Sequence, residues 1–219
     1  KNYRKRVIQM GERPKFVYNF GAPGAENAIN YLKDYGFSNN EILPYYNSQD
    51  LTPNWNTKKE HRITAFNFVD QNGKNFGSKS LKDKIYIANF FFTTCPGICP
   101  KMTKCFKVLQ DSISLMNHVE LVSFSVMPWI DTVNKLKKYG EENGVNPAKW
   151  HLLTGDKSII YSLGRSSFFA DNNKLTDSTT FLHTDKMYLI DKNQQIRGVY
   201  NATNMDDISR VLTDIKALK

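Results

Sequence analysis

Two cysteines, Cys95 and Cys99, stand four residues apart in the stretch 90–100, which reads Phe-Phe-Phe-Thr-Thr-Cys-Pro-Gly-Ile-Cys-Pro. An apolar run precedes them and a helical pattern follows, so the pair falls at a predicted turn from strand to helix. Four residues make just over one helical turn, which places both thiols on the same side. Such a pair can close a disulfide or hold one soft metal ion. With Pro100 opening the helix, the helix dipole and nearby lysines predict a lowered thiol pKa.

The spacing of the pair leaves the chemistry open. Thioredoxin-type oxidoreductases use C-x-x-C, whereas the extra residue here still permits a disulfide but also leaves room for a metal. Two thiolates are an incomplete ligand set for copper or zinc, so we expect a further ligand among the four histidines. His183 is the strongest candidate, because it stands at the entry to a late predicted strand, from which a loop-borne ligand can reach the cysteine turn. We interpret His61, His118 and His151 as structural.

The elements around these residues alternate between strands and helices. We expect strands at 63–69, 84–92, 119–126, 150–153, 186–190 and 195–200, and helices at 100–116, 131–143, 157–163 and 206–218. The order β-β-α-β-α-β-α-β-β-α, closed by a hairpin at 191–193, predicts an α/β three-layer sandwich with a mixed central sheet and a C-terminal β-hairpin. That succession suits the thioredoxin fold.

The chain divides by composition into two parts. Residues 1–60 mix Gly, Pro, Asn and Tyr around one helical candidate at 26–35, and predict an irregular extension or stalk that packs on a core domain at 61–219. The net charge of +9 is spread over several elements without an aromatic-basic motif, which argues against nucleic-acid binding. No apolar run reaches the roughly 18 residues of a membrane span. The first residue is Lys1, so we expect an anchor to lie outside this sequence.

The cysteine turn, its flanking Phe run and the late Leu-His-Thr-Asp-Lys-Met-Tyr-Leu-Ile-Asp segment resemble the SCO/SenC family of copper chaperones over roughly 63–218. The resemblance implies a thioredoxin-like fold and a copper ion, Cu(I) or Cu(II), bound by Cys95, Cys99 and His183. It also implies assistance in assembling the binuclear copper site of cytochrome c oxidase. Two thiolates and an imidazole suit a three-coordinate Cu(I) site.

Two positions depart from the family pattern. Gly97 replaces a residue that is often acidic, and Met127 replaces the first Asp of a frequent Asp-Pro-x-x-Asp motif whose second Asp remains as Asp131. Met127 is either a packing residue or a soft, weak extra contact to copper. Cys105 lies six residues after Cys99 and is interpreted as a small apolar core residue.

Three functions compete for the cysteine pair. The first is a copper-binding metallochaperone that delivers copper to an oxidase subunit or another cuproprotein, and the second is a thiol-disulfide oxidoreductase that reduces the copper-ligand cysteines of a partner. A peroxiredoxin-like peroxidase ranks last, because the sequence shows no arginine clearly placed to polarise a bound peroxide, as such active sites require. Related proteins work outside the cytoplasm, so the resemblance implies a periplasmic location, an inner-membrane anchor and a reductant protein as a possible second partner.

Overall fold

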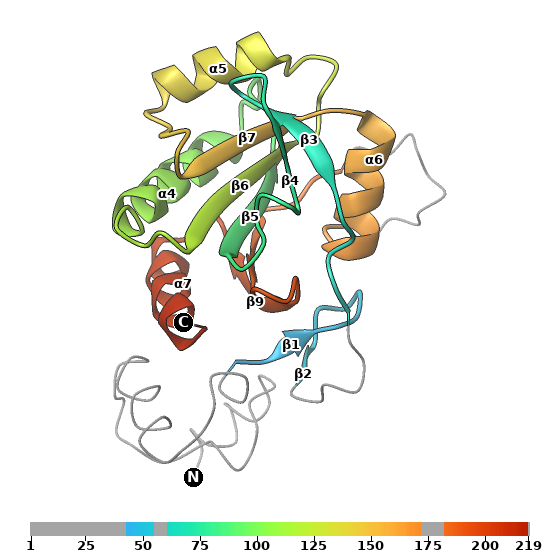
Figure 1. Ribbon diagram of the computed structural model, residues 1–219, viewed down its shortest axis with the longest axis vertical. Helices are drawn as coiled ribbons and strands as arrows, with labels where there is room; N and C mark the ends of the chain where they lie inside the picture. Colours follow the sequence, from blue (N-terminus) through green and yellow to red (C-terminus); the bar gives the residue numbers. More distant parts are fainter. Residues whose placement is uncertain (1–42, 55–60, 172–181, 219) are drawn as a thin grey trace.

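The fold is a seven-stranded mixed sheet with helices on both faces (Figure 1), in a computed structural model that describes residues 43–54, 61–171 and 182–218. The sheet order is β4-β3-β7-β6-β5-β8-β9. The strands are β3 (Asn67–Asp70), β4 (Asn75–Gly77), β5 (Ile85–Phe91), β6 (Val119–Ser125), β7 (Trp150–Thr154), β8 (Lys186–Ile190) and β9 (Ile196–Asn201). The helices are α4 (Cys99–Ser112), α5 (Val133–Glu142), α6 (Lys157–Ser162) and α7 (Met205–Ala217), and a π-helical turn (Leu163–Ser167) continues α6.

The centre of the sheet is formed by β5 and β6, in which every residue is buried. Strand β5 is a nearly continuous apolar run, as expected for a strand covered on two faces, whereas β6 also carries the buried polar residues Glu120, Ser123 and Ser125. The predicted strands at 84–92 and 119–126 are confirmed. Because β5, β6 and β7 are parallel, their carboxyl ends meet at one edge of the sheet. The cysteine turn follows β5 at this edge, where open α/β sheets commonly place their binding sites.

The start of the domain differs from the prediction. The strand expected at 63–69 is shorter, and an unpredicted strand, β4, pairs with it, so the order begins β-β-β-α. The Asp70 carboxylate accepts hydrogen bonds from the N–H groups of Asn72 and Lys74, and Gly73 adopts φ +75°, which turns the chain back. The returning strand has three residues, too short to show alternation in the sequence.

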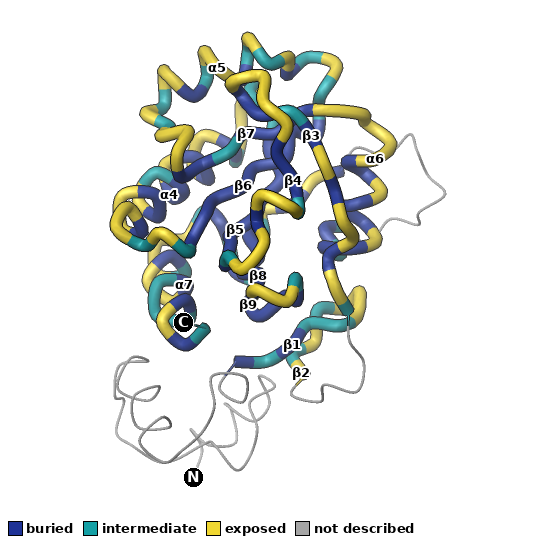
Figure 2. The backbone as a smooth tube through the Cα atoms, viewed as in Figure 1, coloured by how far each residue is buried: buried dark blue, intermediate teal, exposed yellow. Residues whose placement is uncertain are grey.

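Two apolar layers hold the sandwich together, and Figure 2 shows the dark, buried segments converging on the sheet. On one face, buried residues of α4, α5 and α7 form a cluster with β5 to β8. On the other, α6 and its π-helical turn cover an aromatic cluster: Phe66, Phe68, Phe90, Phe124, Phe168 and Tyr188. Phe90 and Phe91 point to opposite faces, as alternation along β5 requires. The predicted three-layer α/β sandwich with a mixed sheet and a C-terminal hairpin is confirmed.

A short hairpin of β1 (Tyr45–Tyr46) and β2 (Pro53–Asn54) precedes the sheet. The fully buried guanidinium of Arg197 on β9 donates to the carbonyl oxygens of Leu43 (2.8 Å) and Pro44 (3.1 Å) and lies 3.9 Å from the ring centroid of Tyr45. This part of the predicted extension therefore contacts the domain. The predicted helix at 26–35 and the boundary at residue 60 lie outside the described residues. Within the described ranges, no helix combines the length and apolarity needed to cross a membrane.

Candidate metal centre

The cysteine turn joins the end of β5 to the start of α4, as predicted. Helix α4 begins at Cys99, with Ile98 at the N-cap, so Cys99 is one residue further into the helix than expected. Pro100 fits the first turn because a helix offers no intrahelical acceptor for N–H groups there. Cys95 lies in the preceding loop, where its N–H contacts the carbonyl oxygen of Phe92 at 3.4 Å.

The two cysteines are free thiols in hydrogen-bond contact with each other. Burial by itself would raise the pKa of Cys95. Hydrogen bonds from the N–H and the thiol of Cys99 outweigh this effect and hold the pKa of Cys95 below its ordinary value, and the N–H groups of Gly97 and Ile98 act in the same direction. These donors belong to the first turn of α4 and the loop that leads into it. The turn thus favours a thiolate at the half-buried Cys95.

Cys99 behaves in the opposite way. It is 4% exposed, and burial raises the pKa of its thiol to about 12, with negative charge at Cys95 and Asp131 adding to the effect. The prediction of a lowered thiol pKa is confirmed for Cys95 and wrong for Cys99, because removal from water outweighs the helix dipole. The pair therefore combines a thiolate-prone sulfur with a sulfur that keeps its proton.

A buried carboxylate fixes the cysteine loop to the sheet. Asp131, which is 0% exposed, accepts hydrogen bonds from the Thr93 N–H (3.1 Å) and hydroxyl (2.5 Å) and from the Ser125 hydroxyl (2.6 Å). Thr93 stands two residues before Cys95, and Ser125 ends β6, so one side chain joins the loops that follow two neighbouring strands. The sequence identified Asp131 only as part of a family motif, and its pairing with Thr93 was not predicted.

Tyr139 on α5 is a second neighbour of the thiols that the sequence did not indicate. Its hydroxyl lies 2.6 Å from the Thr103 hydroxyl on α4, and its ring centroid lies 5.7 Å from that of Phe91. Burial raises the pKa of Tyr139, and negative charge at Cys99 and Cys95 raises it further. The sequence does not predict this contact, because a tyrosine on an amphipathic helix is common and the contact depends on how α5 packs against α4.

His183 lies in the segment before β8, and its side chain is exposed. It lines a pocket of about 460 Å³ together with Ile98, the residue directly before Cys99, and with Asp171 and Asp185. His183 and the cysteine turn thus border the same hollow. Within the described residues, no three or more His, Cys, Asp or Glu side chains are grouped closely enough to hold a metal. The three-ligand set stays a prediction.

Two of the other histidines have structural partners. The Nε2 atom of His61 lies 2.7 Å from the Ser167 carbonyl oxygen, and His151 stacks on Phe76 with 3.8 Å between ring centroids. The His151 Nε2 atom lies 3.6 Å from the Glu120 carboxylate.

The remaining residues singled out from the sequence differ in outcome. Cys105 is buried in the same cluster as Cys99, which confirms the core interpretation. Met127 is half-buried in the loop after β6, and its carbonyl oxygen accepts from the Asp131 N–H; whether its sulfur contacts copper stays a prediction. Gly97 is exposed, and a Cβ there would meet nothing closer than the Cys95 sulfur at 4.0 Å.

The mixed sheet and the thiol pair at the start of its first crossover helix define a thioredoxin-like α/β domain. The sequence model of the SCO1/SenC family matches residues 55–219, and the chain belongs to that family.

Three solved structures resemble this chain. A SCO1/SenC family lipoprotein from Bacillus anthracis is 31% identical, with a TM-score of 0.65 over 72% of this chain and 95% of its own. BsSco, described as having a disulfide switch and as a member of a family of cytochrome c oxidase assembly proteins, is 32% identical, with a TM-score of 0.60 over 71% and 94%. Arabidopsis thaliana ScoI, solved with copper bound, is 29% identical, with a TM-score of 0.57 over 70% and 97%.

Proposed function

We propose that this chain is a copper metallochaperone that holds one copper ion through Cys95, Cys99 and His183. The observation that carries the proposal is the contact between the two thiols at the start of α4, beside a pocket lined by His183 and Ile98. Two sulfurs and an imidazole are soft and borderline donors that suit copper, and the homologue from Arabidopsis thaliana was solved with copper bound.

The receiving partner, on this proposal, is a copper-binding subunit of a cytochrome c oxidase or another cuproprotein. The family name carried by BsSco supports this class of partner, and the lipoprotein from Bacillus anthracis supports an extracytoplasmic location beside a membrane. The Phe91 ring and the other apolar residues under the turn keep water from the inner side of the site. The cysteine on that side, Cys99, releases its proton when the metal binds.

Copper titration of the reduced protein tests the ligand set. We expect one ion per chain, and we expect His183→Ala to weaken binding roughly 100-fold, or about 2.7 kcal/mol, with an unchanged thermal unfolding midpoint. The matched control is His61→Gln, which keeps a donor for the Ser167 carbonyl oxygen and should leave copper affinity unchanged. Copper affinity that is unaltered by His183→Ala would contradict the three-ligand site.

A thiol-disulfide oxidoreductase is the second candidate, favoured by the opposite pKa shifts of the two thiols. The Cys95 thiolate attacks a partner disulfide and forms a mixed disulfide, which releases one partner thiolate. Cys99 then loses its proton and displaces the other, so the partner gains two electrons and Cys95–Cys99 becomes a disulfide. Cys95→Ser or Cys99→Ser should abolish reduction of a disulfide substrate, whereas His183→Ala should largely spare it. Retained reduction by either serine variant would eliminate this function.

A further inference from the structure

An exposed tryptophan stands beside the cysteine turn. Trp129 is 52% exposed and lies in the loop after β6, where the Asp131 N–H donates to the Met127 carbonyl oxygen at 2.8 Å. The Asp131 carboxylate in turn accepts hydrogen bonds from Thr93, two residues before Cys95. The loop that presents Trp129 and the loop that presents the thiols are therefore joined to each other at one edge of the sheet.

Helix α6 holds a lysine against this tryptophan. The Nζ atom of Lys157, the first residue of α6, lies 4.9 Å from the centroid of the Trp129 ring in a cation–π contact. The helix is fixed to the same loop, because the Tyr161 hydroxyl donates to the Val126 carbonyl oxygen at 3.0 Å. Lys157 is exposed, so its ammonium group can still donate to an incoming acceptor. The loop and the helix thus present an apolar ring and a cation side by side.

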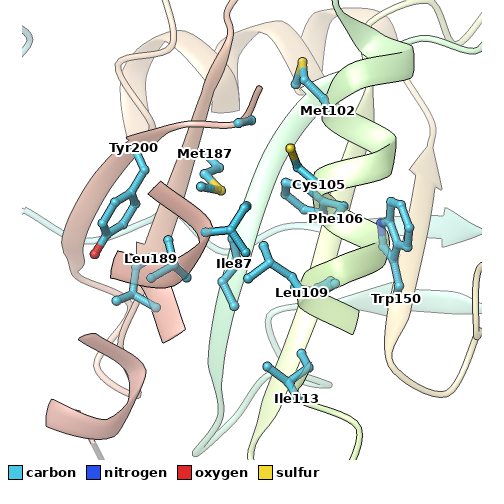
Figure 3. Close-up of a cluster of buried hydrophobic side chains, with 14 of the residues drawn as sticks. Ile87, Met102, Cys105, Phe106, Leu109, Ile113, Trp150, Met187, Leu189 and Tyr200 are labelled. Atoms are coloured by element: carbon cyan, nitrogen blue, oxygen red, sulfur yellow. The ribbon is translucent and has the colours of Figure 1, made fainter. Parts of the chain in front are cut away.

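Positive charge gathers on the helices that begin at this edge. Lys101 and Lys104 lie in the first two turns of α4 and are exposed. Figure 3 shows Met102 and Phe106 on the inward side of the same helix, where both are fully buried, which leaves the lysines facing the solvent. None of the ion pairs between described residues includes these two lysines or Lys157. Their charge is therefore available to a partner.

The carboxylates near the site do not neutralise these lysines. Asp156 caps α6, and its carboxylate accepts from a backbone N–H of that helix at 3.0 Å rather than pairing with Lys157. Asp171 and Asp185 instead line the pocket beside His183. A partner that carries carboxylates opposite the starts of α4 and α6 is therefore attracted to this edge in a defined orientation.

We propose that Trp129, Lys157 and the two exposed lysines of α4 form the docking surface for the copper-receiving protein, which contributes an apolar side chain and carboxylates. This inference rests on the proposed function for the identity of the partner. Tryptophan is among the residues that most often dominate the binding energy of an interface. Because the loop that carries Trp129 is already fixed by hydrogen bonds, docking orders few further groups.

An anionic membrane would attract the same cations, but the transfer of copper favours a protein as the occupant. The ligands of the receiving protein must reach Cys95 and Cys99, so its surface has to cover the edge where Trp129 stands. A lipid surface in that place would cover the thiols and exclude the receiving protein.

Calorimetry of the reduced, metal-free chain with the soluble, copper-free domain of the oxidase subunit from the same organism tests the docking surface. We expect Trp129→Ala to weaken binding roughly 30-fold, as for a tryptophan that dominates an interface. Lys157→Gln should weaken binding about threefold and reduce its dependence on salt, as expected for a charge at the rim. Leu115→Ala and Lys82→Gln are the matched controls, because both residues are exposed and stand at the opposite edge of the sheet, near the starts of β6 and β5. Neither control should change the affinity.

The copper affinity of each variant is measured separately with a chromophoric Cu(I) chelator. Trp129→Ala should keep the copper affinity and the fold of the wild type, because its ring is exposed and is not one of the proposed ligands. A chain that binds the oxidase domain but takes up no copper would refute the copper chaperone and not the docking surface. The two proposals can therefore fail separately.

Three results would overturn the docking inference. The first is a wild-type chain that forms no complex with the oxidase domain, even though it binds copper. The second is a Trp129→Ala variant that binds the domain as tightly as Leu115→Ala does. The third is binding to vesicles of phosphatidylcholine and phosphatidylglycerol that Trp129→Ala abolishes while its affinity for the oxidase domain is unchanged, because that result would assign the surface to a membrane.

Discussion

Replacing Asp131 tests whether one buried carboxylate holds the cysteine loop in place. Its oxygens accept two hydrogen bonds from Thr93 and one from Ser125, at 2.5–3.1 Å. Asp131→Ala removes all three acceptor contacts and leaves a cavity between the loops that follow β5 and β6. We therefore expect a loss of global stability together with a looser Cys95 loop.

The magnitude follows from the three bonds. Hydrogen bonds to a charged group contribute roughly 1.5–3 kcal/mol each, which sets an upper bound of about 4.5–9 kcal/mol. The hydroxyls of Thr93 and Ser125 can turn to other acceptors, and water can enter, so we expect about 3–5 kcal/mol for Asp131→Ala. For a chain of this size, that lowers the thermal midpoint by roughly 6–20 °C. Asp131→Asn keeps the shape and one acceptor oxygen, and should cost about 1–3 kcal/mol.

Urea unfolding of the reduced, metal-free protein measures these losses. Glu141→Gln, an exposed charge removal on α5, is the control and should change stability by less than about 0.5 kcal/mol. Asp131→Asn should also lower the pKa of Cys99, although burial will keep this pKa above its ordinary value. If Asp131→Ala were no less stable than the Glu141→Gln control, the hydrogen bonds that Asp131 accepts from Thr93 and Ser125 would not stabilise the protein.

Three further predictions follow from burial and close contacts. At pH 8, iodoacetamide should modify Cys95 well before Cys99, as read by mass spectrometry of digested protein, because the pKa of Cys95 is lowered and burial raises that of Cys99 to about 12; equal rates would refute the asymmetry. Glu120→Gln should cost about 1–2 kcal/mol at pH 7. Burial would raise the pKa of Glu120, but its hydrogen bonds to a histidine and a lysine outweigh burial and lower it. The Glu120 carboxylate therefore contributes fully to the free energy of unfolding above its unfolded-state pKa of about 4.3, and this contribution is lost as the pH falls through the lower folded-state pKa. The unfolding free energies of the wild type and the variant should converge at pH values below that range. Gly77→Ala should destabilise by about 3 kcal/mol or more, since its Cβ would lie 2.1 Å from a backbone oxygen. A Cβ at Gly140, on helix α5, would make only ordinary van der Waals contacts, so Gly140→Ala should be neutral or stabilising. Similar melting points for Gly77→Ala and Gly140→Ala would contradict this reasoning.

The sequence predicted most of the sheet, and it failed where elements are short. A nearly continuous apolar run identified β5, because strands buried on both faces are rich in apolar residues, whereas β6 also carries the buried polar residues Glu120, Ser123 and Ser125. The three-residue strand β4 was missed because its pairing depends on the turn at Asp70 rather than on its own pattern. Beyond the helix expected at 157–163, the chain continues into a π-helical turn, where the Phe168 N–H bonds to the Leu163 carbonyl oxygen. No local signal distinguishes that turn from a loop.

By itself, the sequence determined the cysteine turn, since spacing, prolines and the strand before it are local properties. It also indicated His183, first through its place before a late predicted strand and then through a family resemblance. Only the tertiary structure decided how the two thiols differ, because the pKa of Cys99 depends on burial beneath the first turn of α4. The Asp131–Thr93 pairing and the Tyr161–Val126 hydrogen bond likewise join residues 38 and 35 positions apart. Side chains so far apart in the sequence meet only when the sheet and its helices pack together. A local sequence pattern therefore cannot predict which of them come into contact.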